Sequence, residues 1–553
     1  MWFFRAVALD LDGTLTEGDQ LSESGMGAVK ACRAERRVIL VTGRVFDDLE
    51  AAFPGLWREF DAVVTENGAV LHTGAGARPL ASPVDAAIHG ALADRGVSAR
   101  AGQVLFALAA EDAVTAAQVI ADLGLDCQVI RNRGAAMILP AGVTKGTGLL
   151  AALDELGLSP HNAIAVGDAE NDLALLQAAE VGAAVASAVP SLAAHADLRL
   201  GSRDGSAVTE LVTGPLLTGQ QRLCPARRWV PIGTFDDRKP VLVPGSQGSV
   251  LIAGDTGAGK SYLAGLLAER WIDAGYTVLV LDPEGDHIGL TQRPGVHLVD
   301  AAAHLPAPAD LLAINRPGRA SLVLDLSGLP EDAKSAYLDR LPDAIAAERA
   351  QHGIPHWVIT DEAHLTQHGS AEQPHGPGFA EPGTCIVTWR PDTLPAVRDT
   401  VDIILATTGT PAAAANAPMA APRATISVNG QPPRPFTIAT RVSPHVRHQH
   451  KYTAVPLPAD RRFYFHTTGE PAAATLEEFS RHIRHCDQAV LAYHLARGDF
   501  SRWITGVLAD RSLGTHLAAI ERDIANRYAA ELERARHRII HAIDDRYPLT
   551  DEP

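Results

Sequence analysis

The sequence predicts an α/β protein with two doubly wound, Rossmann-like parallel-sheet domains, followed by a small α+β or helical C-terminal domain. Short β-branched runs alternate with Ala- and Leu-rich stretches in residues 6–186 and again in residues 249–409. This alternation is typical of β-α-β units. The length of 553 residues also favours roughly three to four domains of about 150 residues each.

The composition excludes several classes of protein. With 46% hydrophobic and 20% charged residues, the chain has enough apolar material for several cores and too much for a disordered protein. The net charge of −17 excludes a surface that binds polyanions as a whole, although a local basic groove stays open. Five widely spaced cysteines with no C-x-x-C pair indicate neither a disulfide framework nor a zinc site. With no signal peptide and no long apolar stretch, we expect a cytoplasmic protein without a membrane span.

The first domain is expected to span residues 1–215. Runs such as AVALDLD, RRVILVTGR and NAIAVGDAEND supply its strands, and the segments between them supply its helices. Over about residues 80–144 the alternation of strands and helices is interrupted, because the strand-like GQVLFALAAED and DCQVIRN flank the helical segment AVTAAQVIADLGL. This stretch predicts a small α+β cap inserted into the domain.

Two carboxylates follow the first predicted strand in the sequence DLDGT, at the sheet edge where α/β proteins bind ligands. Asp10 can attack phosphorus to form an aspartyl-phosphate, and Asp12 can protonate the leaving oxygen. Such a pair needs a hard cation, usually Mg²⁺, with oxygen ligands. Asp168 and Asp172, in GDAEND after a later strand, are expected at the same metal.

Two further residues at predicted ligand-binding positions complete this set. Thr42, in VILVTGR, is expected to hydrogen-bond the phosphoryl oxygens, and Lys145, in GVTKG, to neutralise them. The ordered motifs DLDGT, VTGR, ENGA, GVTKG and GDAEND resemble the haloacid dehalogenase (HAD) superfamily of phosphatases. The resemblance covers residues 1 to about 215 and is to the Cof-type subgroup, with a cap between the second and third motifs.

The resemblance implies a role for each motif residue. Asp10 would be the nucleophile and Asp12 the general acid and base, with Thr42 and Lys145 binding phosphate. The implied Mg²⁺ ligands are Asp10, the backbone carbonyl of Asp12, and Asp168, with Asp172 and Asn171 supporting the metal and phosphate shell. The short cap is similar to those of phosphoglycolate-phosphatase-like members and implies a small phosphorylated metabolite as substrate.

A Gly-, Pro- and Arg-rich linker is expected over residues 216–240, before a second domain at 241–425. There GDTGAGKS follows the apolar run SVLIA and precedes the helical YLAGLLAERW, which is the context of a P-loop. We expect its backbone N–H groups and lysine to hold the phosphates of ATP, and its serine to contact Mg²⁺. The predicted nucleotide-binding residues are Gly254, Asp255, Thr256, Gly257, Ala258, Gly259, Lys260 and Ser261.

An acidic pair in HWVITDEAH is expected to complete an ATPase site. Asp361 would hold the metal through water and Glu362 would orient the attacking water. LDPEGDH, TDEAH and VTWRPD, in that order, resemble the HerA/FtsK superfamily of ring-forming, nucleic-acid-translocating ATPases over about residues 230–410. That family usually has a polar Gln where this chain has Trp389. The following Arg390 is either a trans-acting arginine of an oligomer or a solvated side chain.

The rest of the chain carries weaker signals. The Ala/Pro-rich segment 411–422 is interpreted as a loop or linker. In residues 426–553 we expect a small module whose last part is helical, because apolar residues recur there at helical spacing. RFYFHTTGEP through YHLARGDFSRWI resembles an uncharacterised module appended to other bacterial and archaeal proteins. Its histidines match no zinc signature.

These motifs predict a bifunctional hydrolase: a Mg²⁺-dependent phosphomonoesterase joined to an ATP-binding and ATP-hydrolysing P-loop domain. Two alternatives stay open. One is a HerA/FtsK-like nucleic-acid motor whose HAD domain trims phosphorylated ends or nucleotides, and the other is a nucleotide-gated regulatory or scaffold protein. The motor has one basic and aromatic cluster in its favour, consisting of Arg227, Arg228, Trp229, Arg238 and Lys239. A homo-oligomer, including a ring, also stays open.

Overall fold

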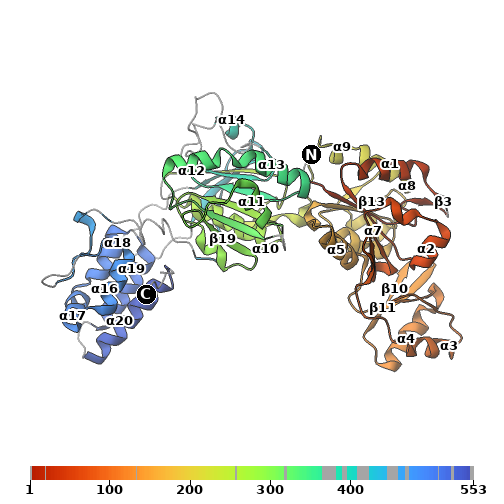
Figure 1. Cartoon of the computed structure of the whole chain (residues 1–553), viewed down its shortest axis with the longest axis horizontal. Helices are drawn as coiled ribbons and strands as arrows, with labels where there is room; N and C mark the ends of the chain where they lie inside the picture. The colour runs from red at the N-terminus through yellow and green to blue at the C-terminus, as the bar shows by residue number, and fades with distance from the viewer. Residues whose placement is uncertain are drawn as a thin grey trace.

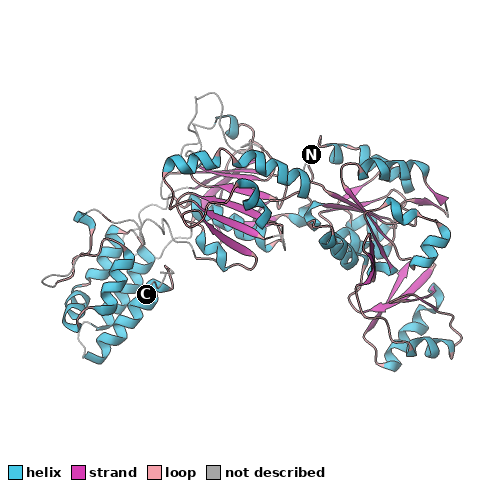
Figure 2. Cartoon of the chain, viewed as in Figure 1, coloured by secondary structure: helices cyan, strands magenta, loops and turns pink. Residues whose placement is uncertain are grey.

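The computed structural model describes residues 3–18, 20–132, 134–255, 258–316, 320–363, 381–388, 395–407, 422–444, 457, 459–466, 472–508, 510–524 and 529–547. These residues form an N-terminal α/β domain with a cap, a central α/β domain and a C-terminal helical module (Figure 1). Figure 2 shows sheets in the first two parts and helices in the third. The predicted fold class is therefore confirmed. Among the described residues, no helix has both the length and the apolar character needed to cross a membrane.

The N-terminal domain is built on a sheet of order β14-β13-β12-β1-β4-β5-β6-β7. Its parallel strands are β1 (Ala6–Leu9), β4 (Arg37–Val41), β5 (Ala62–Thr65), β12 (Ala163–Gly167), β13 (Val181–Ala184) and β14 (Leu198–Arg199). The antiparallel β6 (Val70–Thr73) and β7 (Gly76–Pro79) extend one edge. A small hairpin of β2 (Thr16–Glu17) and β3 (Gln20–Leu21) follows β1.

Helices cover both faces of this sheet, which is why the parallel strands read as continuous apolar runs. On one face lie α1 (Glu23–Arg33), α2 (Phe46–Ala52), α8 (Asp204–Thr213) and α9 (Pro215–Thr218). On the other lie α5 (Lys145–Glu155), α6 (Leu173–Ala178) and α7 (Pro190–His195).

The cap is an α+β unit with an antiparallel sheet of order β10-β11-β9-β8. Its strands are β8 (Arg100–Ala101), β9 (Phe106–Ala109), β10 (Cys127–Asn132) and β11 (Ala135–Pro140). Helices α3 (Ala87–Ala93) and α4 (Ala113–Leu123) pack on one face. Met137 and Leu139, on alternate positions of β11, instead pack with Val45 and Val70 of the core domain. The cap therefore has its free sheet face toward the core.

The central domain has an eleven-stranded sheet of order β16-β15-β25-β24-β23-β17-β22-β21-β18-β20-β19. The strands from β23 to β19 are parallel: β17 (Ser249–Ala253), β18 (Val278–Asp282), β19 (Val296–Asp300), β20 (Ser321–Asp325), β21 (Trp357–Thr360), β22 (Thr384–Thr388) and β23 (Ile403–Thr407). The antiparallel β15 (Val230–Phe235), β16 (Pro240–Val243), β24 (Arg423–Val428) and β25 (Arg434–Ile438) form the other edge. The sheet thus continues past residue 425, the limit that the sequence suggested for this domain.

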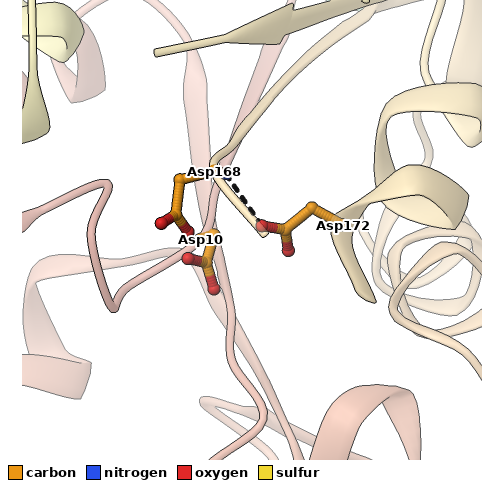
Figure 3. Close-up of side chains that lie close together, drawn as sticks. All are labelled: Asp10, Asp168 and Asp172. Atoms are coloured by element: carbon orange, nitrogen blue, oxygen red, sulfur yellow. Dashed lines mark hydrogen bonds between the residues drawn. The ribbon is translucent and has the colours of Figure 1, made fainter. Parts of the chain in front are cut away.

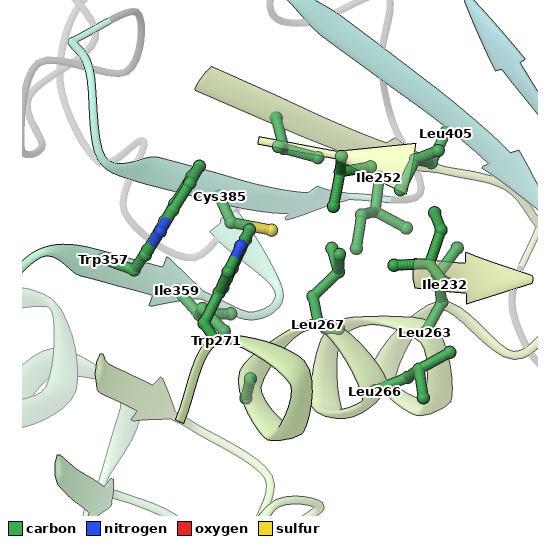
Figure 4. Close-up of a cluster of buried hydrophobic side chains, with 14 of the residues drawn as sticks. Ile232, Ile252, Leu263, Leu266, Leu267, Trp271, Trp357, Ile359, Cys385 and Leu405 are labelled. Atoms are coloured by element: carbon green, nitrogen blue, oxygen red, sulfur yellow. The ribbon is translucent and has the colours of Figure 1, made fainter. Parts of the chain in front are cut away.

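The core of the central domain lies between this sheet and α10 (Lys260–Asp273). Trp271 of α10 stacks on Trp357 of β21 with ring centroids 3.7 Å apart (Figure 4). Helices α11 (Pro308–Ile314), α12 (Glu331–Leu338) and α13 (Leu341–His352) pack on the opposite face, and α14 (Pro395–Arg398) precedes β23. The central sheet therefore lies between two apolar layers, with α10 on one face.

The C-terminal module is helical among its described residues. It consists of α16 (Leu476–His485), α17 (Gln488–Arg497), α18 (Asp499–Val507), α19 (Arg511–Ile524) and α20 (Ala529–Asp544) around one apolar cluster. Phe463, in RFYFHT, forms an isolated antiparallel bridge with Ala473. The segment RATISVNG, just after residue 422, supplies β24 of the central sheet.

The two α/β domains dock through residues that lie just before their strands. Asn162 precedes β12 and donates a hydrogen bond from Nδ2 to the Gly353 carbonyl at 3.0 Å. Glu180 precedes β13, and its carboxylate accepts from Ser246 Oγ at 2.5 Å and from the Tyr276 hydroxyl at 3.1 Å. The amino ends of the two parallel sheets therefore meet, and their carboxyl edges lie away from the contact.

The linker arginines take part in the same contact. Arg227 forms an ion pair with Asp197 at 2.7 Å and donates to the carbonyls of Leu176 and Ala179, at the end of α6. Arg228 also donates to the Ala179 carbonyl, at 2.6 Å. Two members of the predicted basic cluster thus bind the N-terminal domain itself.

Candidate functional site

The first site lies where β1 and its neighbour β12 end. Asp10 follows β1 and Asp168 follows β12, and the two strands pair in parallel register. One carboxylate oxygen of each of Asp10, Asp168 and Asp172 lies within 4.8 Å of the others. Figure 3 shows the three carboxyl groups gathered at this sheet edge. They are 3%, 0% and 0% exposed, so the cluster is buried.

Lys145 lies among these carboxylates. Thr144 caps α5 through a capping box with Thr147, which makes Lys145 the first residue of the helix. Its Nζ lies 2.5 Å from Asp10 Oδ1 and 2.6 Å from Asp172 Oδ1. The other Asp172 oxygen accepts from the backbone N–H groups of Asp168 and Ala169. Asp172 therefore ties the lysine to the loop that carries Asp168.

The charges of this cluster call for a further cation. Burial, and then Asp172, raise the pKa of Asp10 well above its usual value, although Lys145 acts in the opposite direction. Burial by itself lowers the pKa of Lys145, but Asp10 and Asp172 outweigh it and the net shift is upward. When all three carboxylates are ionised, they exceed the charge of Lys145 by two. Carboxylate oxygens are preferred ligands of Mg²⁺, so these residues fit a divalent ion.

Asp12 lies beside Arg44 and outside the carboxylate cluster. Arg44 Nη2 lies 2.6 Å from Asp12 Oδ1, and Arg44 Nε lies 3.0 Å from Oδ2. This forked geometry fixes the carboxylate more firmly than a single contact. The Asp12 side chain is 39% exposed, unlike the three buried carboxylates of the cluster.

Thr42 and Asn171 complete the predicted phosphatase residues. Thr42 directly follows β4, is fully buried, and accepts from the Arg44 N–H at 3.2 Å. Asn171 Nδ2 donates to Asn67 Oδ1 at 3.0 Å. The structure thus brings Thr42, Lys145, Asn171 and the aspartates to one edge of the sheet.

The second site lies where β17 leads into α10. Gly254 has φ 154°, and a Cβ there would lie 2.2 Å from Thr407 Oγ1, so only glycine fits this close approach. Lys260 begins α10, and its Nζ donates to the Asp255 carbonyl at 3.1 Å. Thr256 and Gly257 lie outside the described residues.

The predicted acidic partner lies beside the P-loop. Asp361 follows β21. Burial by itself raises the pKa of Asp361, but hydrogen bonds from His287 and Ser261 lower it below the usual value. Glu362 has the uncommon φ of 46° and donates its N–H to Asp361 Oδ1 at 2.9 Å. Trp389 and Arg390 lie outside the described residues.

Sequence reasoning gave no role to three residues that the structure places at these sites. Arg44 and Glu66 lie in the motifs VTGR and ENGA, and His287 ends LDPEGDH. His287 Nε2 lies 2.8 Å from Asp361 Oδ2, and the Asp282 carboxylate accepts the His287 N–H at 2.7 Å. The only sequence signal for these three residues is that each is a charged or polar residue in a motif that follows a strand. That signal does not indicate which residue it contacts.

Comparisons with known proteins divide the chain in the same way. A family model described as haloacid dehalogenase-like hydrolase matches residues 7–83 and 99–212, and one described as Helicase HerA, central domain, matches residues 247–315. The phosphoglycolate phosphatase of Methanothermobacter thermautotrophicus is 32% identical over 219 residues, which are 38% of this chain and 97% of the relative. The Archaeoglobus fulgidus phosphoglycolate phosphatase is 31% identical over 224 residues, 37% of this chain and 94% of the relative. A solved Thermoplasma acidophilum structure matches 38% of this chain and 96% of its own at 18% identity, with a TM-score of 0.34.

Proposed function

The chain belongs to the haloacid dehalogenase-like hydrolases through its N-terminal domain, and we propose that this domain hydrolyses a phosphomonoester through an aspartyl-phosphate on Asp10. The observation that carries the proposal is the buried cluster of Asp10, Asp168 and Asp172 with Lys145 in contact. This cluster offers a nucleophile, oxygen ligands for a metal, and a cation for the phosphoryl oxygens.

The proposed reaction has two displacements at phosphorus. An Asp10 oxygen attacks, the ester P–O bond breaks, and the leaving oxygen takes a proton from Asp12. Asp12, now ionised, accepts a proton from a water whose oxygen attacks phosphorus. The bond to Asp10 then breaks and inorganic phosphate leaves. Lys145 and Thr42 are proposed to bind the phosphoryl oxygens throughout.

A Mg²⁺ ion, when bound, would neutralise charge on the phosphoryl oxygens. The residues proposed to hold it are Asp10, Asp168 and Asp172, together with the backbone carbonyl of Asp12. The side chains of Asp10, Asp168 and Asp172 are buried, and burial together with their mutual repulsion raises the pKa of Asp10, which supports the assignment without fixing a coordination geometry.

The proposed substrate is a small phosphorylated metabolite. The relatives that match this domain over nearly their whole length are phosphoglycolate phosphatases. The test is phosphate release from a panel of phosphoglycolate, sugar phosphates and 3′-phosphorylated oligonucleotides. Turnover of the small esters supports the proposal. Turnover of the oligonucleotides alone would instead indicate that the domain removes phosphate from nucleic-acid ends.

We further propose that the central domain binds and hydrolyses ATP with Mg²⁺. Gly254 through Ser261 would hold the phosphates, Asp361 and Ser261 the metal, and Glu362 the attacking water. The lowering of the Asp361 pKa, first by His287 and also by Ser261, supports this arrangement. Phosphate release from ATP in the absence of any ester substrate tests it directly.

The HerA match over residues 247–315 favours a nucleic-acid motor as the second candidate. The internal pairing of Arg227 and Arg228 removes part of the basic cluster that would support it. ATP turnover at low salt, with and without single- or double-stranded DNA, separates the two cases. Stimulation by DNA would favour the motor, and unchanged turnover would exclude it. Size-exclusion chromatography with and without ATP tests for a homo-oligomer.

A further inference from the structure

Glu66 is a buried carboxylate of the core domain that binds the cap. It follows β5 and is 1% exposed. One carboxylate oxygen accepts the Gln103 N–H at 2.7 Å, and the other accepts those of Val104 and Leu105 at 2.8 and 3.0 Å. All three donors belong to the cap loop between β8 and β9. One side chain thus satisfies three backbone groups across the boundary between core and cap.

The local backbone is shaped for this contact. Glu66 and Asn67 have φ of 52° and 54°, a region that residues other than glycine rarely adopt. A Cβ at Gly102 would lie 2.6 Å from the Glu66 carboxylate, so only glycine lets the cap loop come this close to Glu66. Two such residues in succession persist only where surrounding contacts hold them.

The same residue is bound to the loop that carries Arg44. The Glu66 N–H donates to the Arg44 carbonyl at 2.9 Å, and the Asn67 N–H donates to the Thr42 carbonyl at 3.0 Å. The Arg44 guanidinium in turn holds Asp12. A short series of hydrogen bonds therefore leads from the cap loop through Glu66 and Arg44 to the Asp12 carboxylate.

We propose that Glu66 is a positioning residue that fixes the cap to the Arg44 loop and so holds Asp12 where it protonates the leaving oxygen. The proposal rests on the proposed phosphomonoesterase function and deepens it. It adds a condition to proton transfer, because Asp12 is correctly placed only while the cap loop is bound to Glu66. Glu66 itself does not contact the reacting atoms.

The leaving group provides the test. An alkyl ester such as phosphoglycolate needs its leaving oxygen protonated, whereas p-nitrophenolate leaves readily as an anion, so loss of general-acid positioning harms the alkyl ester selectively. We expect Glu66→Ala to lower kcat/KM at least about tenfold for the alkyl ester and less than about threefold for p-nitrophenyl phosphate. Retained turnover of the aryl ester also shows that the variant is folded. Equal losses for both esters would overturn the proposal.

Three further variants sharpen this comparison. Glu66→Gln keeps one oxygen able to accept from Val104 and Leu105, so its alkyl-to-aryl ratio should lie between those of wild type and Glu66→Ala. Glu111→Ala removes an exposed cap carboxylate and should leave the ratio unchanged. In a double-mutant cycle, adding Glu66→Ala to Arg44→Ala should cause no further selective loss, because both act through Asp12. Additive losses would contradict the shared route.

Hydrogen exchange tests the contact without any substrate. In Glu66→Ala the amides of Gln103, Val104 and Leu105 should exchange at least about tenfold faster than in wild type, since each loses its acceptor. Unchanged protection would overturn the proposal regardless of catalysis. If exchange accelerates but wild type hydrolyses neither ester, the contact stands and the proposed phosphomonoesterase function fails.

Discussion

Asn162 of the N-terminal domain and His356 of the central domain share a hydrogen bond, with Asn162 Oδ1 3.1 Å from His356 Nε2. The asparagine amide nitrogen also donates to the carbonyls of Phe3 at 2.7 Å and Gly353 at 3.0 Å. One fully buried amide therefore has partners in both domains. Buried polar groups therefore hold the two domains together.

Replacing this amide should weaken the docked structure. Asn162→Ala removes the hydrogen bonds that this amide makes with His356 and the Gly353 carbonyl, and losing such a bond at a buried group costs about 1–3 kcal/mol. We expect the free energy of unfolding, measured in urea, to fall by about 2 kcal/mol or more. Gln118→Ala, on the exposed side of cap helix α4, is the matched control and should change it by less than about 0.5 kcal/mol. Equal effects of the two changes would contradict this role of Asn162.

Glu180 should make the docked structure sensitive to acid. Burial by itself raises the pKa of Glu180, but the hydrogen bond and charge of His161, then Arg228, lower it below the usual 4.5. Its carboxylate therefore stabilises the folded chain fully above pH 4.5, and this contribution is lost as the pH falls through the lower folded-state pKa. The comparison is urea unfolding of wild type and Glu180→Gln between pH 7 and pH 3. The stability difference should be constant at the higher pH values and shrink below 4.5; a difference that grows on acidification would reverse the assigned sign.

Asp10→Asn should abolish ester hydrolysis alone. The amide cannot form the aspartyl-phosphate, so turnover of the best small ester should fall by at least about a thousandfold. ATP hydrolysis should stay at the wild-type rate because Lys260 and Asp361 are untouched. Asp47→Asn changes an exposed aspartate of the same domain and should keep both activities. Loss of both activities in Asp10→Asn would count against two separate sites.

Lys260→Ala should have the opposite effect. Removing the ammonium leaves the β and γ phosphates without their side-chain cation, so we expect ATP hydrolysis to fall at least about a hundredfold. Ester hydrolysis should be retained. Lys239→Ala, at an exposed lysine of the same domain, serves as the control. Phosphate release from ATP and from the ester would be measured in parallel on each variant, and a fall in both would show that the sites are not independent.

Removal of divalent cations should stop ester hydrolysis and also be visible without substrate. The carboxylates of Asp10, Asp168 and Asp172 repel one another in the absence of a cation, so Mg²⁺ binding should raise the melting temperature of the N-terminal domain. In Asp168→Asn this Mg²⁺-dependent rise should be reduced or lost, whereas in the Asp47→Asn control it should be kept. A chelator that leaves both ester turnover and melting unchanged would rule out the metal.

Much of the fold and part of each site could be predicted from local sequence. Asp10 and Lys260 each lie in a short motif that follows an apolar strand, one in each α/β domain. In each domain, the carboxyl edge of the parallel sheet gathers the residues that follow its strands, whatever the detailed packing. The same rule explains why Asp168 lies near Asp10. Alternation of apolar runs and helical stretches sufficed for the two α/β sheets because their parallel strands are buried on both faces.

Pairings across long separations could not be predicted in this way. Arg44 lies beside Asp12, and His287 beside Asp361, because of how neighbouring strand-end loops turn, and one sequence does not specify those turns. Glu66 resembles an ordinary solvated glutamate until the cap loop is placed on it. The Ala/Pro-rich segment 411–422 suggests a domain limit near residue 425, yet β24 pairs with β23 across that segment and lies in the central sheet.

The docking of the domains by their amino edges bears on how the two proposed activities relate. Asp10 and Lys260 both follow the opposite, carboxyl ends of strands, so the two reactions open onto separate regions of solvent. A metabolite or phosphate set free at one site must diffuse around both sheets to reach the other. For the two proposed activities, direct channelling within one chain is therefore not expected, and a scavenging enzyme added to the medium should intercept whatever one site releases for the other.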